Sequence, residues 1–245
     1  APEPWLATAF VPGPSLAEAV AAHGPLPVPA VLTLGRLLAE ALSEVHAGGL
    51  VHRDVKPGNV VLGRDGPHLI DFGIARSAAA TALTAPDAVI GTPGFLSPEQ
   101  TRVRGGTVGP ASDLFSLGCV LAYAATGRPP FGGGAADALL YRTVHDRPDL
   151  DGVPDDGGLR ALLERCLAKE PGDRPTAAGV AAELAPDGPD PEAAEDPADV
   201  PDGSGADWLP EPVVAMIADR SARALALPAV DPTEAGPGAL GQPEP

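Results

Sequence analysis

Apolar side chains recur with a helical period along several stretches of the chain. Residues 29–47 are the clearest case, because their apolar positions follow one another mostly at intervals of three or four residues: Val31, Leu34, Leu38, Ala41, Leu42 and Val45. Such spacing puts them on one face of an α-helix, and Gly48-Gly49 favours an end to that helix. Related patterns predict helices over 135–144, 159–168 and 176–184.

Residues 111–126 differ, because they are apolar on nearly all sides. That pattern is typical of a helix buried on every face. Two short apolar runs, 60–62 and 68–70, flank Asp65-Gly66 and predict a small β-hairpin. Ser-Leu-Ala-Glu at 15–18 has the capping-box pattern that begins a short helix. The predicted elements are therefore mainly α, with short hairpins.

The C-terminal part of the chain has a different pattern. Residues 186–207 hold eight acidic residues, five prolines and no basic residue, which predicts a disordered linker. A short helix is predicted within 208–227, where Val213, Val214, Ile217 and Leu225 lie partly on one face. A helix docked on the lobe and a transiently helical segment both fit this pattern, and the second is favoured. Residues 228–245 are rich in Pro and Gly and are interpreted as a disordered tail.

Charge and composition narrow the function classes. The net charge is −17. The part up to residue 185 contributes −6 (14 basic and 20 acidic residues), and the part from 186 contributes −11 (2 basic and 13 acidic residues). The chain has no basic stripe, so no nucleic-acid binding is expected. No run approaches 18 apolar residues, which excludes a helical membrane segment in this chain. Cys119 and Cys166 lack metal or redox spacing and are interpreted as buried free thiols in a reducing compartment.

The most informative stretch for chemistry is His-Arg-Asp-Val-Lys-Pro-Gly-Asn at 52–59, followed by Asp-Phe-Gly at 71–73. Asp54 and Asn59 are separated by a Pro-Gly bend, so both are expected to face one small site. Asp71 follows an apolar run that a hairpin returns to the same place. Oxygen ligands for a nucleotide-bound Mg²⁺, together with a carboxylate beside an incoming hydroxyl, are what phosphoryl transfer requires.

These two motifs resemble the catalytic loop, H-R-D-L-x-x-x-N, and the D-F-G motif of the eukaryotic-type Ser/Thr protein kinases in their bacterial branch. Val55 replaces the Leu of that pattern. Gly-Thr-Pro-Gly-Phe-Leu-Ser-Pro-Glu at 91–99 resembles the end of an activation segment, with Ser-Pro-Glu in place of Ala-Pro-Glu. Residues 112–118 resemble the buried helix that supports the catalytic loop, and Asp-Arg-Pro at 173–175 resembles the late Arg motif. With residues 52–73 counted as one block, four blocks in the right order are far more specific than any one of them.

The resemblance covers about residues 5–184, so a protein kinase domain is expected over 1–185. Residues 5–11 resemble the strand and hinge that join the two lobes of a kinase. The chain contains no Gly-rich phosphate loop and no V-A-I-K motif, and its lysines are Lys56 and Lys169. The chain is therefore expected to be a fragment that holds the hinge and the large C-terminal lobe and lacks the small N-terminal lobe.

The resemblance implies a role for each motif residue near the phosphates. Asp54 is expected to be the catalytic base that accepts the proton of a substrate Ser or Thr hydroxyl. Lys56 places positive charge on the transferred phosphate. Asn59 and Asp71 are expected to hold Mg²⁺, with Mn²⁺ as an alternative ion.

The adenine site and the regulatory segment are also implied by the resemblance. The backbone of Ala9 and Val11 is expected to bind adenine, with Val61 as the floor of the pocket. Arg53 is expected to pair with a phosphorylated residue of the activation segment. Thr84 is the best match for that residue and Thr81 the second. Thr92 is expected to contact Asp54 and Lys56 as part of the substrate platform.

Other motif residues are expected to have structural roles: His52, Phe72, Gly73, Glu99, Asp113 and Arg174. His52 is expected to pack under Phe72. Asp113 is interpreted as a buried carboxylate that accepts N–H groups of the catalytic loop, because a buried charge needs such partners. Glu99 and Arg174 are expected to form a buried ion pair.

The resemblance implies an ATP-dependent Ser/Thr protein kinase that acts on protein substrates, with weak or no activity in this chain alone. A cytoplasmic location is expected, although a longer parent protein with a membrane anchor is compatible with the sequence. Two other functions stay open. One is a non-catalytic kinase-like scaffold, which the missing small lobe favours. The other is a small-molecule phosphotransferase, which shares an H-x-D-x-x-x-x-N loop but is not expected to have a segment like 91–99.

Overall fold

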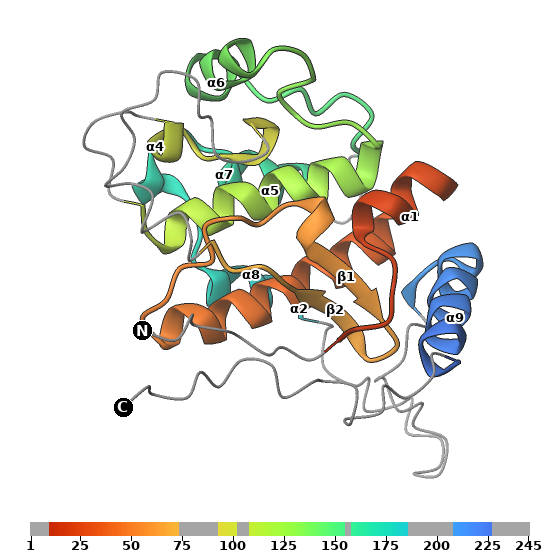
Figure 1. The fold of residues 1–245 in the computed structure, drawn as a ribbon. Helices are drawn as coiled ribbons and strands as arrows, with labels where there is room; N and C mark the ends of the chain where they lie inside the picture. The colour runs from red at the N-terminus through yellow and green to blue at the C-terminus, as the bar shows by residue number, and fades with distance from the viewer. Residues whose placement is uncertain (1–9, 74–92, 102–107, 155–157, 186–207, 227–245) are drawn as a thin grey trace, which may run out of the picture.

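Two long helices form the centre of the molecule. The computed structural model describes residues 10–73, 93–101, 108–154, 158–185 and 208–226. Helix α2 (Val28–Ala47) packs its apolar stripe against α5 (Pro110–Thr126), which is buried along almost its whole length. Figure 1 shows α5 crossing the middle of the molecule with α2 beside it. Both helices match the predicted ranges to within one residue at each end.

The helices that follow α5 cover the rest of this core. Helix α7 (Leu159–Cys166) packs on α5, and α8 (Ala177–Glu183) packs on α2. Gly118 of α5 lies so close to α7 that an added Cβ would come within 2.8 Å of the Cys166 Cβ. Helix α6 (Ala136–His145) contacts the short helix α4 (Pro98–Thr101) and the 3₁₀ turn η2 (Pro93–Phe95). A further 3₁₀ turn, η3 (Pro171–Asp173), precedes α8.

A two-stranded hairpin lies at one edge of the helical core. Strands β1 (Val60–Gly63) and β2 (Gly66–Leu69) are antiparallel, and Gly63 pairs with Gly66. The turn therefore lies at residues 64–65, one residue earlier than the Asp65-Gly66 turn predicted from the sequence. The positive φ of Gly66, 125°, belongs to the first residue of β2. The fold is mainly helical with this small sheet, as expected for the large lobe of a kinase.

The segment that leads into helix α1 (Leu16–His23) is bonded to the hairpin. Leu62 N–H donates to Pro14 O at 2.8 Å, and Ser15 bridges to Val61. A Cβ on Gly13 would lie 2.1 Å from Leu62 O, so only glycine allows this approach. The capping box predicted at Ser15 and Glu18 is present, with both reciprocal hydrogen bonds.

Helix α9 (Glu211–Leu225) is docked, and the expectation of a transiently helical segment is wrong. Leu209, Val213 and Ile217 are buried and belong to the common core. Helix α9 contacts α1, and Figure 1 shows the two side by side. The docking could not be predicted because it also uses polar contacts of Arg220. Their partners, Gly13 and Glu18, lie about 200 positions earlier in the chain. Among the described helices, none combines the length and apolar character needed to cross a membrane.

Candidate active site

The catalytic loop, residues 52–59, brings three of the predicted site residues into direct contact. Lys56 Nζ lies 2.8 Å from Asp54 Oδ2, and Asn59 Nδ2 donates to the same oxygen at 3.0 Å and to Asp54 O at 2.9 Å. The 3₁₀ turn η1 (Pro57–Asn59) makes the bend that returns Asn59 to Asp54. The Asp54 and Lys56 side chains are 18% and 24% exposed, so a substrate can reach them.

Asp71 lies on a segment that is bonded to the same loop. Ile70 N–H donates to Asn59 O, and Gly73 N–H donates to His52 O, both at 2.9 Å. These two bonds lay residues 70–73 along the catalytic loop, with Asp71 between them. Its side chain is exposed to solvent. The loop and the Asp-Phe-Gly segment are therefore neighbours, as the sequence predicted.

The donor set at this place suits Mg²⁺. Because Asn59 Nδ2 donates to Asp54, the amide oxygen Oδ1 is the atom of Asn59 that remains as a ligand. Asp71 adds an exposed carboxylate. Within the described ranges, no three His, Cys, Asp or Glu side chains form a metal cluster. One amide and one carboxylate match Mg²⁺ bound together with substrate phosphates, because that ion keeps several waters and takes few protein ligands.

Asp113 of α5 holds the catalytic loop from behind. Its side chain is 1% exposed, and its two oxygens accept from His52 N–H and Arg53 N–H, each at 2.8 Å. His46 Nε2 also lies 2.8 Å from Asp113 Oδ2. The loop contacts agree with the expectation for Asp113. The sequence analysis missed His46, which lies in the last turn of α2 and outside the recognised motifs.

Two residues of the site adopt backbone conformations that are rare for side chains with a Cβ. Arg53 has φ of 68° and Asp71 has φ of 57°, and among the described residues they are the non-glycine residues with positive φ. Such conformations cost about 1–3 kcal/mol each and gather at functional sites. Both lie beside the predicted catalytic and metal-binding side chains. The strain here therefore marks the same site as the sequence motifs do.

His52 packs against Phe72 and joins the two motifs. Their ring centroids are 4.6 Å apart at an interplanar angle of 32°. His52 is fully buried, and this burial lowers the pKa of its imidazole, although the carboxylates of Asp113 and Asp54 act in the opposite direction. A neutral, buried ring suits the structural role expected for His52.

Glu99 and Arg174 form the expected ion pair, and both side chains are buried. Arg174 Nη1 and Nη2 donate to the two Glu99 oxygens at 2.7 and 2.9 Å, and Ser112 Oγ donates to Glu99 Oε1 at 2.6 Å. Burial raises the pKa of Glu99, but hydrogen bonds from Arg174 and Ser112 outweigh it and hold the pKa below its usual value. The pair connects α4 to Arg174, which directly follows η3.

The nucleotide edge is described only in part. Val61 lies in β1, next to the place where Gly13 approaches Leu62 O. Val11 lies just before Gly13 in the chain. Ala9, Thr81, Thr84 and Thr92 lie outside the described residues. The structure therefore gives no geometry for the adenine contact of Ala9, for the phosphorylation sites or for the substrate platform.

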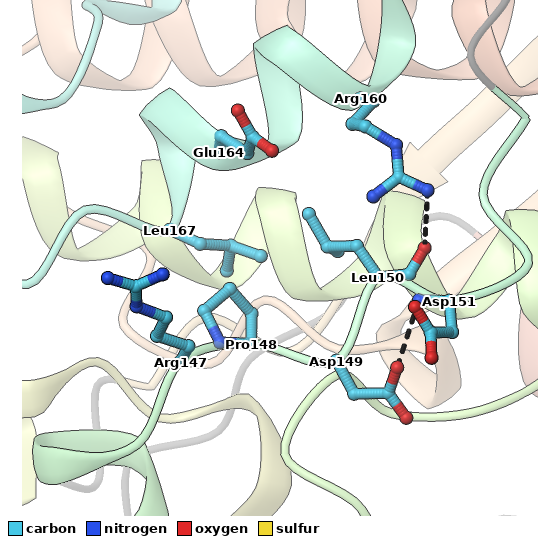
Figure 2. Close-up of a pocket in the computed structure, with 8 residues that line it drawn as sticks. All are labelled: Arg147, Pro148, Asp149, Leu150, Asp151, Arg160, Glu164 and Leu167. Atoms are coloured by element: carbon cyan, nitrogen blue, oxygen red, sulfur yellow. Dashed lines mark hydrogen bonds between the residues drawn. The ribbon is translucent and has the colours of Figure 1, made fainter.

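Figure 2 shows a hollow elsewhere on the lobe, between α7 and the segment that follows α6. Arg160 reaches across it and donates to Leu150 O at 3.1 Å and to Val153 O at 3.0 Å. Asp151 N–H donates to Asp149 Oδ1 at 2.9 Å in the same segment. The residues that line the hollow include none of the predicted site residues, and Arg160 is engaged by the segment itself. The hollow is therefore separate from the candidate active site.

Comparison with known proteins places the chain in a family. A family model described as "Protein kinase domain" matches residues 2–184. The chain belongs to the protein kinase family. The protein kinase fold is also found in the crystal structure of Rad53 1-466 in complex with AMP-PNP, with a TM-score of 0.60, 26% identity, and coverage of 72% of this chain and 45% of that one.

Three curated relatives of this kinase domain come from bacteria. The serine/threonine-protein kinase AfsK of Streptomyces coelicolor is 45% identical over 221 residues, which cover 89% of this chain and 26% of AfsK. PkwA of Thermomonospora curvata is 50% identical, over 75% of this chain and 24% of PkwA. PknB of Mycobacterium leprae is 38% identical, over 75% of this chain and 30% of PknB. These relatives confirm the resemblance to bacterial Ser/Thr kinases. The chain spans about a quarter of the length of the first two.

Proposed function

We propose that the chain carries the catalytic lobe of a Ser/Thr protein kinase, which transfers the γ-phosphate of ATP to a protein hydroxyl. The observation that carries this proposal is the contact of Asp54 with both Lys56 and Asn59, at 2.8 and 3.0 Å. The names of the bacterial relatives and the AMP-PNP in the Rad53 complex support it.

Each side chain of the loop has a distinct task in this reaction. Asp54 orients the substrate hydroxyl and accepts its proton as the oxygen attacks phosphorus. Lys56, held at the same carboxylate, offers its ammonium group to the phosphoryl oxygens. Asn59 and Asp71 hold Mg²⁺, with Mn²⁺ as an alternative. When bound, the metal neutralises charge on the phosphates.

The nucleotide and regulatory assignments belong to the same proposal. The backbone of Ala9 and Val11 binds the adenine of ATP, and Val61 lies under the ring. Arg53, beside Asp54, pairs with phosphorylated Thr84, or with Thr81 as second choice. Thr92 belongs to the substrate platform. Phosphopeptide mapping of active protein tests the phosphorylation site, and an unmodified Thr84 in such a sample would refute it.

The catalytic proposal is tested by replacing the base. The chain is incubated with Mg²⁺, γ-labelled ATP and a generic protein acceptor, and incorporated phosphate is measured. Turnover is expected to be slow, because this chain contains neither a Gly-rich loop nor a V-A-I-K lysine to position the triphosphate. Asp54→Asn is expected to abolish the transfer, while Asp65→Asn in the hairpin turn leaves it unchanged. Equal transfer by wild type and Asp54→Asn would contradict the proposal and favour a non-catalytic scaffold.

We also propose that the folded unit extends past residue 185 to include α9, with 186–207 as a linker and 228–245 as a tail. The buried residues of α9 support this extension. The match to AfsK adds support. A continuous match over 89% of the chain has to pass residue 184, where the family model ends, and reach into α9. A cytoplasmic location fits the two buried free thiols, Cys119 and Cys166.

A further inference from the structure

Helix α4 contacts the catalytic loop through a residue that the recognised motifs do not include. Gln100 follows Glu99 in α4, and its Nε2 donates to Arg53 O at 2.9 Å. Its Oε1 accepts from Ser97 N–H at 2.9 Å and from Ser97 Oγ at 3.1 Å. Both ends of the Gln100 amide are therefore used, one by Ser97, which immediately precedes α4, and one by the catalytic loop.

The chemistry of these partners settles the orientation of the Gln100 amide. The Ser97 backbone N–H can only donate, so it must meet the oxygen Oε1. The Arg53 carbonyl can only accept, so it must meet the nitrogen Nε2. Glutamate has the same shape but cannot donate to a carbonyl, and methionine can serve neither partner. Among these three side chains, only glutamine satisfies both contacts.

The contact of Gln100 falls on the strained part of the loop. Arg53 has φ of 68°. Its N–H belongs to the peptide unit before it and donates to Asp113 Oδ1 at 2.8 Å. Its carbonyl belongs to the next peptide unit, which also contains the Asp54 N–H. Asp113 therefore fixes the orientation of the peptide unit between His52 and Arg53. Gln100 fixes the orientation of the peptide unit between Arg53 and Asp54.

Helix α4 is itself held firmly. Glu99, the neighbour of Gln100, is bound by Arg174 and Ser112 at distances of 2.6–2.9 Å. Helix α4 also overlaps the end of the 91–99 segment, whose Thr92 is expected to belong to the substrate platform. A residue that joins this helix to the Arg53 carbonyl is well placed to hold the catalytic base in register with the substrate platform.

We propose that Gln100 is a positioning residue for Asp54. Its hydrogen bond to the Arg53 carbonyl holds the peptide unit between Arg53 and Asp54, and this fixes the direction of the Asp54 carboxylate. The inference rests on the proposed kinase function. It differs from the role of Asp113, because Gln100 acts from α4 on the Arg53 carbonyl and Asp113 acts from α5 on the N–H groups of His52 and Arg53.

Gln100→Glu and Gln100→Met test this role, with Thr101→Val as the matched control in the same helix. Thr101 Oγ1 donates to Pro98 O at 2.7 Å, so its hydrogen bond stays within its own helix. Gln100→Glu keeps the acceptor for Ser97 and loses only the donor to Arg53. We expect both Gln100 variants to lower kcat about tenfold, the effect of one lost hydrogen bond to a strained peptide, with KM for ATP unchanged. Thr101→Val keeps the wild-type kcat.

Amide hydrogen exchange supplies a second measurement that needs no turnover. In the whole chain, the peptide covering residues 50–56 is expected to exchange about tenfold faster in Gln100→Glu than in wild type or Thr101→Val. Wild-type kcat and exchange in Gln100→Glu would overturn the inference, even if Gln100→Met were impaired. Asp54→Asn separates the two proposals. If it abolishes transfer while Gln100→Glu behaves as wild type, the positioning role fails and the kinase function stands.

Discussion

Two Glu–Arg pairs join distant parts of this chain, and they differ in burial. Glu99–Arg174 ties α4 to the end of the lobe, and Glu18–Arg220 ties α1 to α9. The shortest N–O distance is 2.7 Å in both. The Arg174 and Glu99 side chains are 0% and 5% exposed, whereas those of Arg220 and Glu18 are 40% and 48% exposed. Equal geometry thus occurs in opposite environments.

The surroundings of each pair follow from its burial. Arg174 also donates to three backbone carbonyls, those of Ala111, Ala168 and Lys169, at 2.8–3.0 Å. A buried guanidinium needs such partners, because water cannot reach it. Arg220 has one further contact of this kind, to Gly13 O at 3.3 Å. We infer that the first pair is part of the fold of the lobe, while the second helps α9 to dock on a lobe that is already folded.

Removing Arg174 is expected to cause the largest loss of stability among the changes to these two pairs. Arg174→Ala leaves the Glu99 carboxylate buried without its counterion, so the free energy of unfolding should fall by about 3–5 kcal/mol. Denaturant unfolding followed by circular dichroism measures this change. Arg165→Ala is the control, because its pair with Glu183 is about half exposed. If the free energy of unfolding fell no more in Arg174→Ala than in Arg165→Ala, burial would not determine how much these ion pairs stabilise the fold.

The apolar face of α9 should matter more for docking than its charges. Ile217 is 1% exposed and lies in the common core. Ile217→Ala is expected to lower the free energy of docking α9 by about 2–5 kcal/mol, through lost burial and the cavity left behind. Faster amide exchange in residues 208–226, with unchanged exchange in α5, is the expected result. Leu225→Ala on the same helix is the control, because Leu225 is 87% exposed.

This contrast also explains what the sequence was able to predict. Glu99, Arg174, Asp113 and the loop residues belong to motifs of fixed spacing, so the sequence predicts their roles. The docking of α9 depends on Gly13, Pro12 and Glu18, which no local pattern links to a segment about 200 residues later.

Some contacts inside the lobe were also beyond the sequence. Gln100 and His46 reach the catalytic loop through side chains whose neighbours only the folded chain defines. The Asp-Gly pattern predicts the hairpin turn one residue too late, because Gly66 begins β2. Periodicity therefore located the helices, motifs located the loop, and contacts between distant segments required the structure.

Breaking the exposed pair should have a smaller effect than truncating Ile217. Arg220→Ala is expected to lower the free energy of docking α9 by about 0.2–1 kcal/mol, because solvent screens an ion pair exposed to this extent. The effect should shrink further at high salt. Amide exchange in residues 208–226 at low and high salt measures both changes. An effect as large as that of Ile217→Ala would mean that charge, and not apolar burial, holds α9.

The smallest expected effect is the acid sensitivity of docking. Hydrogen bonds from Arg220 and from the Ser15 backbone lower the pKa of Glu18 from 4.5 to about 2. The Ser15 bonds belong to the α1 capping box and remain when α9 undocks, so only the part of the lowering due to Arg220 separates docked from undocked Glu18. Undocked Glu18 therefore binds more protons than docked Glu18 as the pH falls towards 2. The contribution of the pair is therefore complete above pH 4.5 and is lost as the pH falls towards 2. Given the exposure of both side chains, its size should stay below about 1 kcal/mol.

Trp208 offers a probe for this acid effect, because it packs against the core next to α9. In a Trp5→Phe background it is the only tryptophan left in the chain, so its emission reports the docked state between pH 5 and 3. We expect docking to weaken slightly as the pH falls. In Glu18→Gln the part of the slope due to this pair should disappear, because the amide does not titrate. If Glu18→Gln kept the full slope, the acid response would have to come from other carboxylates, and the exposed pair would contribute nothing measurable to the docking of α9.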